Sequence, residues 1–173
     1  MPIISRDELR ERLQRDLSGV VVTAASNTGN GAGEPPKEAP ELLRTSDILI
    51  QAERLPDVAT YLRDTLGYGF LSDIVAVDYL AHGLFELVYR FYTIEGGGEL
   101  VIKVRVPREQ PDVPSLTPIW PGADLNEREA YDLFGINFIG HPYLKRIYLW
   151  DEFEGYPMRK DFPKQGDNYL DEG

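Results

Sequence analysis

The chain has 173 residues, 29 of them acidic and 18 basic, so its formal net charge is −11, and it contains no cysteine. A chain of this length fits one domain and buries roughly two thirds of its unfolded surface. The negative charge repels phosphate backbones, which argues against a nucleic-acid partner, and the lack of cysteine excludes disulfides and thiolate-ligated clusters.

The first 45 residues are predicted to form a helix, a strand and a flexible linker. Ser5 and Glu8 have the spacing of a capping box, and leucines recur every fourth residue from Leu9 to Leu17, before Gly19. Residues 20–24 are rich in valine and read as a strand. Residues 26–40 are rich in Gly, Pro and Asn, which is typical of a linker. The charged N-terminus lacks a secretory signal, and no run approaches the roughly 18 apolar residues of a membrane span.

The main domain is predicted to cover residues 46–163. A strand at 48–50 precedes a helix with an apolar stripe from Leu55 to Leu66, which ends at Gly67. Three β-rich runs follow at 70–80, 84–94 and 99–106, with short turns between them, and they predict an antiparallel meander. Apolar residues alternate with mostly polar ones in the last run, which predicts a strand with one buried face and one solvent-exposed face.

Five prolines between 107 and 121 are expected to keep that stretch out of helix and strand, apart from a short turn near Trp120. A helix then follows, with Asp124 or Asn126 as its N-cap and Glu127 and Glu129 in its first turn, and it ends at Gly135. Residues 137–163 are predicted to be extended and loop-rich. Residues 164–173 form an acidic tail.

Charged residues on this helix offer two readings. Glu129 and Asp132 are three residues apart, and two carboxylates that close could do acid/base work together with His141. The alternative is a solvated helix face on which Arg128 neutralises Asp132. We prefer the second reading, with His141 bonded to backbone or to a neighbouring acid. His82 is expected to be a solvent-facing turn residue, and the glycines show no phosphate-binding spacing.

Aromatic residues are dense between 143 and 162 and are mixed with basic residues. Interface cores favour this mixture of aromatic side chains and arginine, although a small domain also uses aromatic side chains to cover its core. The interface reading gains weight because loop-rich terminal segments rarely bury so many aromatic side chains by themselves.

The string from Glu127 to Ile136 (EREAYDLFGI), followed by Gly140-His141-Pro142, Arg146-Ile147 and residues 155–162 (GYPMRKDF), resembles the 30 kDa subunit family of respiratory complex I. In bacteria this is the C subunit of the NADH-quinone oxidoreductase. About twenty positions match at fixed spacing. Met158 replaces the family's usual leucine, which is a volume-conserving change.

The resemblance implies a soluble subunit of the peripheral arm that lies against the D subunit, which forms the quinone site. It implies no cofactor in this chain, because NADH, FMN, the iron–sulfur clusters and quinone belong to partner subunits. No catalytic, cofactor-binding or metal-binding residue is inherited. The motif residues are expected to be structural or partner-docking: Glu127, Arg128, Glu129, Asp132, Gly135, His141, Pro142, Arg146, Arg159, Lys160 and Asp161.

The expected fold is therefore α+β, with a single antiparallel or mixed sheet packed with two or three helices and an extended, loop-rich C-terminal segment. We expect residues 137–163 to lie along the partner, with Arg146, Arg159 and Lys160 making charge-assisted contacts. The chain would then be peripheral on the cytoplasmic side of the membrane. Two alternatives are the equivalent subunit of a membrane-bound hydrogenase or a ferredoxin- or deazaflavin-fed dehydrogenase, and a free-standing carboxylate acid/base enzyme.

Overall fold

The structure is a computed structural model that describes residues 4–22, 47–96 and 98–163. The predicted linker at 26–40 and the acidic tail lie outside these ranges. The described helices are Arg6–Asp16 (α1), Leu55–Asp64 (α2) and Ala123–Phe134 (α3), with short 3-10 turns at Ala52–Arg54 (η2) and Leu80–His82 (η3). The described strands are Ile48–Ile50 (β1), Phe70–Tyr79 (β2), Leu84–Tyr92 (β3), Leu100–Pro107 (β4), Asp112–Pro114 (β5) and Asn137–Ile139 (β6).

The main sheet has the strand order β1-β4-β3-β2. Strands β2, β3 and β4 form the predicted antiparallel meander, and β1 adds to β4 in parallel, with Ile48 opposite Ile102. The predicted α+β class and mixed sheet are confirmed. The parallel β1 requires a long connection, which α2 and the meander supply.

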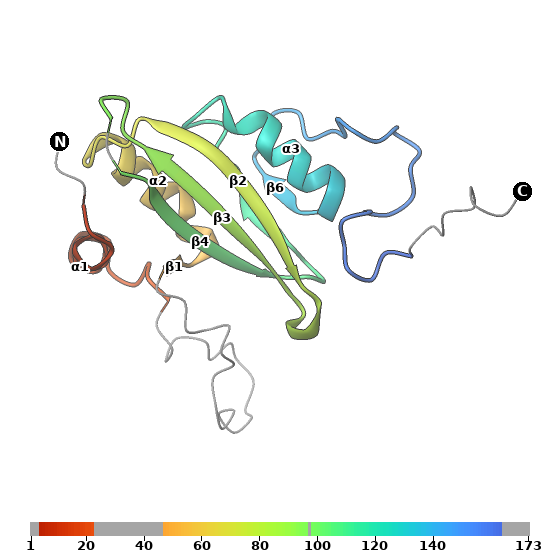
Figure 1. Cartoon of the computed structure of the whole chain (residues 1–173), viewed down its shortest axis with the longest axis horizontal. Helices are drawn as coiled ribbons and strands as arrows, with labels where there is room; N and C mark the ends of the chain where they lie inside the picture. Colours follow the sequence, from red (N-terminus) through yellow and green to blue (C-terminus); the bar gives the residue numbers. More distant parts are fainter. Residues whose placement is uncertain (1–3, 23–46, 97, 164–173) are drawn as a thin grey trace, which may run out of the picture.

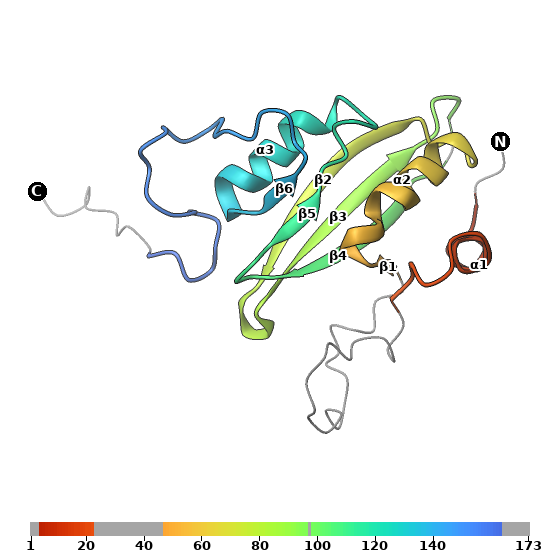
Figure 2. The same cartoon turned by 180° about the vertical axis from the view of Figure 1, so that it is seen from behind.

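The core lies on the face of the sheet that α2 crosses, and α3 lies on the same side, next to β2 (Figure 1 and Figure 2). Alternation in β4 follows the prediction, because Leu100, Ile102, Val104 and Val106 are all buried. No described helix covers the opposite face in Figure 1. That face is polar near Glu86, whose carboxylate binds Lys103 and Arg105.

Residues 4–22 belong to the stretch that was predicted to lie outside the main domain, but they pack against its core. Ser5 caps α1 through Glu8 N–H as predicted, but Leu9 and Leu13 are fully buried in the domain core. The predicted strand at 20–24 is reduced in its described part to a bridge between Val21 and Ile50. Residues 4–22 pack on the domain because the leucine stripe of α1 needs an apolar surface to cover it.

The proline-rich stretch was expected to contain no strand, and this expectation was wrong at 112–114. Strand β5 pairs in parallel with β6 and forms a second, two-stranded sheet. Pro111 uses its carbonyl oxygen to accept from Asn137 N–H, and Ser115 N–H donates to Ile139. The prolines therefore occupy positions where no backbone donor is needed.

The predicted start of α3 was also wrong. The helix begins at Ala123 after Gly122, and no side chain caps it. Glu127 thus lies beyond the first turn, in which it was predicted to interact with the helix dipole. Its side chain is buried. The predicted end at Gly135 is confirmed, since this residue has φ 74° and caps the helix in the left-handed conformation.

Candidate functional site

Helix α3 carries two carboxylates, Glu127 and Asp132, that are fully buried. The expectation of a solvated helix face was therefore wrong for Asp132. Their partners come from segments on either side of the helix in the sequence, before α3 for Glu127 and after β6 for Asp132. A buried carboxylate is stable in a protein only when its oxygens are paired or hydrogen-bonded, so these partners determine what the motif does.

Glu127 holds the end of strand β5 against α3. Its Oε1 accepts from Leu116 N–H at 2.6 Å, and its Oε2 accepts from the hydroxyls of Ser115 at 2.5 Å and Thr117 at 3.1 Å. Burial raises the pKa of Glu127 above its ordinary value, and these hydrogen bonds offset part of the rise. These hydrogen bonds hold the proline-rich stretch before α3 against the helix.

His141 lies over the same end of the helix, and its side chain is fully buried. Nδ1 accepts from Tyr143 N–H at 3.0 Å. Nε2 lies 3.1 Å from Asp124 Oδ1 and 3.9 Å from Glu127 Oε2, at ion-pair distance but without the geometry of a hydrogen bond. Of the two predicted alternatives, the hydrogen bond to backbone is present, whereas neither neighbouring acid accepts a hydrogen bond from the ring. The adjacent Pro142 is exposed.

Asp132 anchors the chain that follows β6. One oxygen, Oδ2, accepts from three successive backbone N–H groups, those of Ile147 at 2.9 Å, Tyr148 at 2.7 Å and Leu149 at 3.1 Å. The other oxygen accepts from Arg146 Nη1 at 2.8 Å. Burial by itself raises the pKa of Asp132, but the bonds from Arg146 and the three N–H groups outweigh it and hold this pKa below its ordinary value.

The last turn of α3 is capped by the same C-terminal segment. Its final carbonyls have no partner within the helix. Arg146 Nη1 donates to the Asp132 carbonyl at 3.0 Å, Met158 N–H to that of Leu133 at 3.1 Å, and Arg159 Nε to that of Phe134 at 2.6 Å. Two guanidinium groups thus lie at the negative end of the helix dipole, where cations are favoured.

Gly135 allows this closure. A Cβ atom at this position would lie 2.5 Å from the ring of Tyr156 and 2.8 Å from Nη2 of Arg159. Its positive φ is also a conformation that L side chains avoid. The Phe-Gly end of the motif therefore provides room for the returning segment as well as a stop for the helix.

A third buried carboxylate, Asp78, fixes the far end of the segment to the sheet. It accepts from Arg108 Nε at 2.8 Å and from Lys160 N–H at 2.8 Å. Arg108 also binds Asp161 at 2.7 Å, so one guanidinium bridges the sheet and the C-terminal segment. The bond from Arg108 holds the pKa of Asp161 below its ordinary value.

With its buried side anchored in this way, the segment from Gly140 to Pro163 exposes large apolar side chains on its outer side. The exposed fractions are 56% for Tyr143, 64% for Tyr148, 64% for Trp150 and 55% for Met158. We call these four side chains the outer patch. In Figure 1 and Figure 2 the segment continues from β6 and forms a wide loop beside α3.

The hypothesis that Arg146 and Arg159 contact a partner needs correction. Arg146 donates to Asp132, Phe153 and Gly155 inside the chain, and Arg159 donates to Phe134 and lies over the ring of Phe85. Each planar guanidinium group has several N–H donors, and these donors hold the segment in its folded conformation. The side chain of Lys160, by contrast, is exposed.

Arg128 does not neutralise Asp132 as expected. It donates to the carbonyls of Lys145 and Arg146 and lies over the ring of Tyr143. Glu129 is exposed and lies 3.3 Å from the hydroxyl of Tyr148. The acid/base alternative gains no support. Both carboxylate oxygens of Asp132 already accept hydrogen bonds, and His141 lies near Asp124 and Glu127 and not near Asp132 or Glu129.

Sequence reasoning missed Asp78, Arg108 and Ser115 as members of this network. One signal was present for Asp78, because it follows Ile74 and Ala76 at alternate positions and so shares their core-facing side of β2. No comparable pattern marks Arg108 or Ser115.

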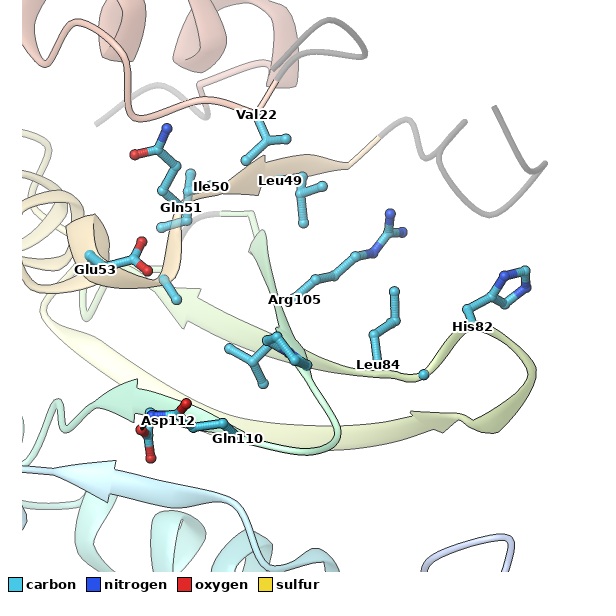
Figure 3. A pocket seen from close by; sticks show the side chains of 14 residues that line it. Val22, Leu49, Ile50, Gln51, Glu53, His82, Leu84, Arg105, Gln110 and Asp112 are labelled. Carbon is cyan, nitrogen blue, oxygen red and sulfur yellow. Dashed lines mark hydrogen bonds between the residues drawn. The ribbon is translucent and has the colours of Figure 1, made fainter. Parts of the chain in front are cut away.

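A separate pocket of about 650 Å³ lies between β1, η2 and the turn after β2, and it does not adjoin the motif. Figure 3 shows Arg105 pointing into it, with Glu53 and Asp112 on one side and His82 at the far end. His82 is exposed, as predicted for a turn residue. Across the described ranges no three His, Asp or Glu side chains are grouped as metal ligands, and no helix is long and apolar enough to span a bilayer.

The lowered pKa of Asp132 predicts a loss of its anchor in acid. A carboxyl whose pKa is lower in the folded state stabilises that state above its unfolded pKa of about 4, and this stabilisation is lost as pH falls through the folded value. We expect pepsin to cleave near Trp150 increasingly as the pH falls below about 4. Asp132→Asn should be cleaved readily throughout this range, and a wild-type chain that resists cleavage at the lowest pH would contradict the prediction.

Comparison with known proteins agrees with the motif. Residues 48–168 match the family described as respiratory-chain NADH dehydrogenase, 30 Kd subunit. The C subunit of the NADH-quinone oxidoreductase of Moorella thermoacetica is 43% identical over 131 residues, which is 76% of this chain and 88% of that protein. The corresponding C subunit of Roseiflexus castenholzii is 46% identical over 117 residues, 66% of this chain and 67% of that one.

Solved structures resemble the fold. A trypsin-resistant fragment of Nqo5 is 34% identical, with a TM-score of 0.50, and the match covers 58% of this chain and 85% of the fragment. A chain of the membrane-bound sulfane sulfur reductase, an archaeal respiratory membrane complex, has a TM-score of 0.68 at 24% identity, covering 92% of this chain and 86% of that one. The second likeness concerns the fold alone.

Proposed function

The chain belongs to the family of the 30 kDa subunit of respiratory-chain NADH dehydrogenase, and we propose that it is a non-catalytic, peripheral-arm subunit of a proton-translocating NADH-quinone oxidoreductase. Its task in this proposal is to dock on the D subunit, which forms the quinone site, and to order the neighbouring subunits. The docking surface is the outer side of the segment from Gly140 to Pro163.

The outer patch is the observation that carries this proposal. Three buried carboxylates, Asp78, Glu127 and Asp132, hold the segment and its surroundings in place, so its exposed aromatic side chains are presented on a fixed framework. Interfaces draw most of their binding energy from a few aromatic and arginine side chains. A surface organised before binding also costs less conformational entropy to dock.

The proposal assigns no iron–sulfur cluster to this chain, because such clusters are held by cysteine thiolates and the sequence contains no cysteine. NADH, FMN, the clusters and quinone would all belong to partner subunits. The chain would reach the cytoplasmic side of the membrane through its partners.

Purification of the tagged chain from solubilised membranes tests this function. We expect the chain to migrate on a native gel with a large assembly, and mass spectrometry to identify the other NADH-quinone oxidoreductase subunits, including the quinone-site partner, in equal amounts. A chain that migrates alone would contradict the docking role. Co-purification with hydrogenase subunits, or with a complex fed by ferredoxin or a deazaflavin, would support the docking role. It would contradict the assignment of the chain to an NADH-quinone oxidoreductase.

A further inference from the structure

Ion pairs are distributed unevenly over the described part of the chain. Every described Lys or Arg before residue 128 has a carboxylate oxygen within 4.0 Å, as does Arg146. The described cations without such a carboxylate are Arg128, Lys145, Arg159 and Lys160. In a chain with a net charge of −11, this places the unneutralised cations together on α3 and the C-terminal segment.

Lys160 stands apart even within this group. Arg128 and Arg159 donate to backbone carbonyls, and the ammonium of Lys145 lies 4.8 Å from the centre of the Tyr143 ring. The backbone N–H of Lys160 is fixed by Asp78, but within the described ranges its ammonium has no carboxylate, carbonyl or ring partner. The backbone is anchored while the charge faces outward.

Lys160 and Arg159 line an open groove of about 700 Å³ that is formed by the C-terminal segment. The rest of its lining is apolar and consists of Leu149, Phe153, Pro157, Phe162 and Pro163. The rings of Phe153 and Phe162 stack with their centres 6.0 Å apart, and a Cβ at Gly155 would lie 2.8 Å from the Phe162 ring. The groove therefore combines two cationic side chains with an apolar lining, which we call its floor.

From this arrangement we infer that the groove binds a peptide segment of a neighbouring subunit, which places an apolar side chain on the floor and a carboxylate against Lys160. The inference rests on the proposed docking function and names the chemistry of the partner. A small inorganic anion would gain nothing from the apolar floor, whereas a peptide satisfies both parts. The carboxylate is that of an Asp or Glu side chain or of a chain terminus.

Zero-length carbodiimide coupling of the purified complex identifies the carboxylate, because this reagent joins an ammonium only to a carboxylate in direct contact. We expect mass spectrometry to show an amide between Lys160 Nζ and another subunit, and the coupled residue distinguishes a side chain from a chain terminus. Coupling only to this chain's own Asp167, Asp171, Glu172 or terminal carboxylate would overturn the inference, as would a Lys160 that couples to nothing.

Substitution separates the groove from the general docking surface. In the full chain, Lys160→Glu should raise the rate of dissociation from the complex by about tenfold or more, and Lys160→Met by less, since repulsion is added only in the first variant. Lys145→Glu makes the same charge change on the docking segment but outside the groove, and it should raise the rate by clearly less than Lys160→Glu does.

The outcomes distinguish this inference from the proposed function. If the chain joins no assembly at all, the docking function is wrong. If it joins the assembly and all three lysine variants dissociate like the wild type, or Lys145→Glu dissociates as fast as Lys160→Glu, docking stands and the groove inference is wrong. The melting temperature of each variant should match that of the wild type, because neither ammonium has a carboxylate partner within the described chain.

Discussion

Replacing Asp132 by Ala is expected to release the C-terminal segment from α3. The variant leaves Arg146 without its carboxylate and three backbone N–H groups without an acceptor, and removal of one partner from a buried ion pair costs about 3–5 kcal/mol. Because the segment lies outside the main sheet, we expect the loss to appear first as local opening. Trypsin cleavage at Lys145, Arg146, Arg159 or Lys160 should accelerate at least about a hundredfold, since 1.36 kcal/mol corresponds to a factor of ten.

Glu129→Ala is the matched control on the same helix. Glu129 is exposed and makes only a long contact with Tyr148, so its removal should change stability by no more than about 0.5 kcal/mol. Asp132→Asn keeps the volume but loses the charge, and it should give an intermediate rate of cleavage. Equal cleavage rates for the wild type and Asp132→Ala would mean that the segment is held by its aromatic packing and not by this carboxylate.

The sheet could be predicted from the sequence because its signals are local. Alternation in residues 100–106 indicates a strand with one buried face, and Gly135 ends its helix where expected. The helix predicted to end at Gly67 stops earlier, at Asp64, with Thr65 as its C-cap. Strand β5 could not be predicted in this way. It forms because β6 lies beside it in the folded chain, and the prolines that argued against a strand occupy positions that need no donor.

The burial of the motif carboxylates was not predictable from local pattern. On a short helix of an acidic chain, Glu127 and Asp132 resemble any other surface acids. Their donors lie at residues 115–117 and 146–149, and only the tertiary structure brings these segments to the helix. The resemblance to a family located the right residues, but it did not assign the roles of Arg146 and Arg159, which depend on where the segment turns back.

The double variant Tyr148→Ser/Trp150→Ser is expected to fold and to lose its place in the complex. Both side chains are 64% exposed, so their removal takes little from the core. Large aromatic side chains at the centre of an interface contribute roughly 2 kcal/mol or more each. The affinity for the complex should fall at least about a hundredfold. Membranes from cells with this variant as the sole copy should then lose NADH-quinone oxidoreductase activity, while the melting temperature of the isolated chain stays within a few degrees.

Phe70→Ser/Ile94→Ser provides the matched control, because it also removes two exposed apolar side chains, 53% and 82% exposed, at one end of β2 and β3. If docking uses the outer patch, this control should assemble normally. Loss of assembly in the control together with normal assembly of Tyr148→Ser/Trp150→Ser would move the interface to the sheet. The exposed aromatic side chains of the segment would then have to be explained as a cover for Phe153 and its neighbours, since Trp150 packs edge-on against that ring at 4.9 Å.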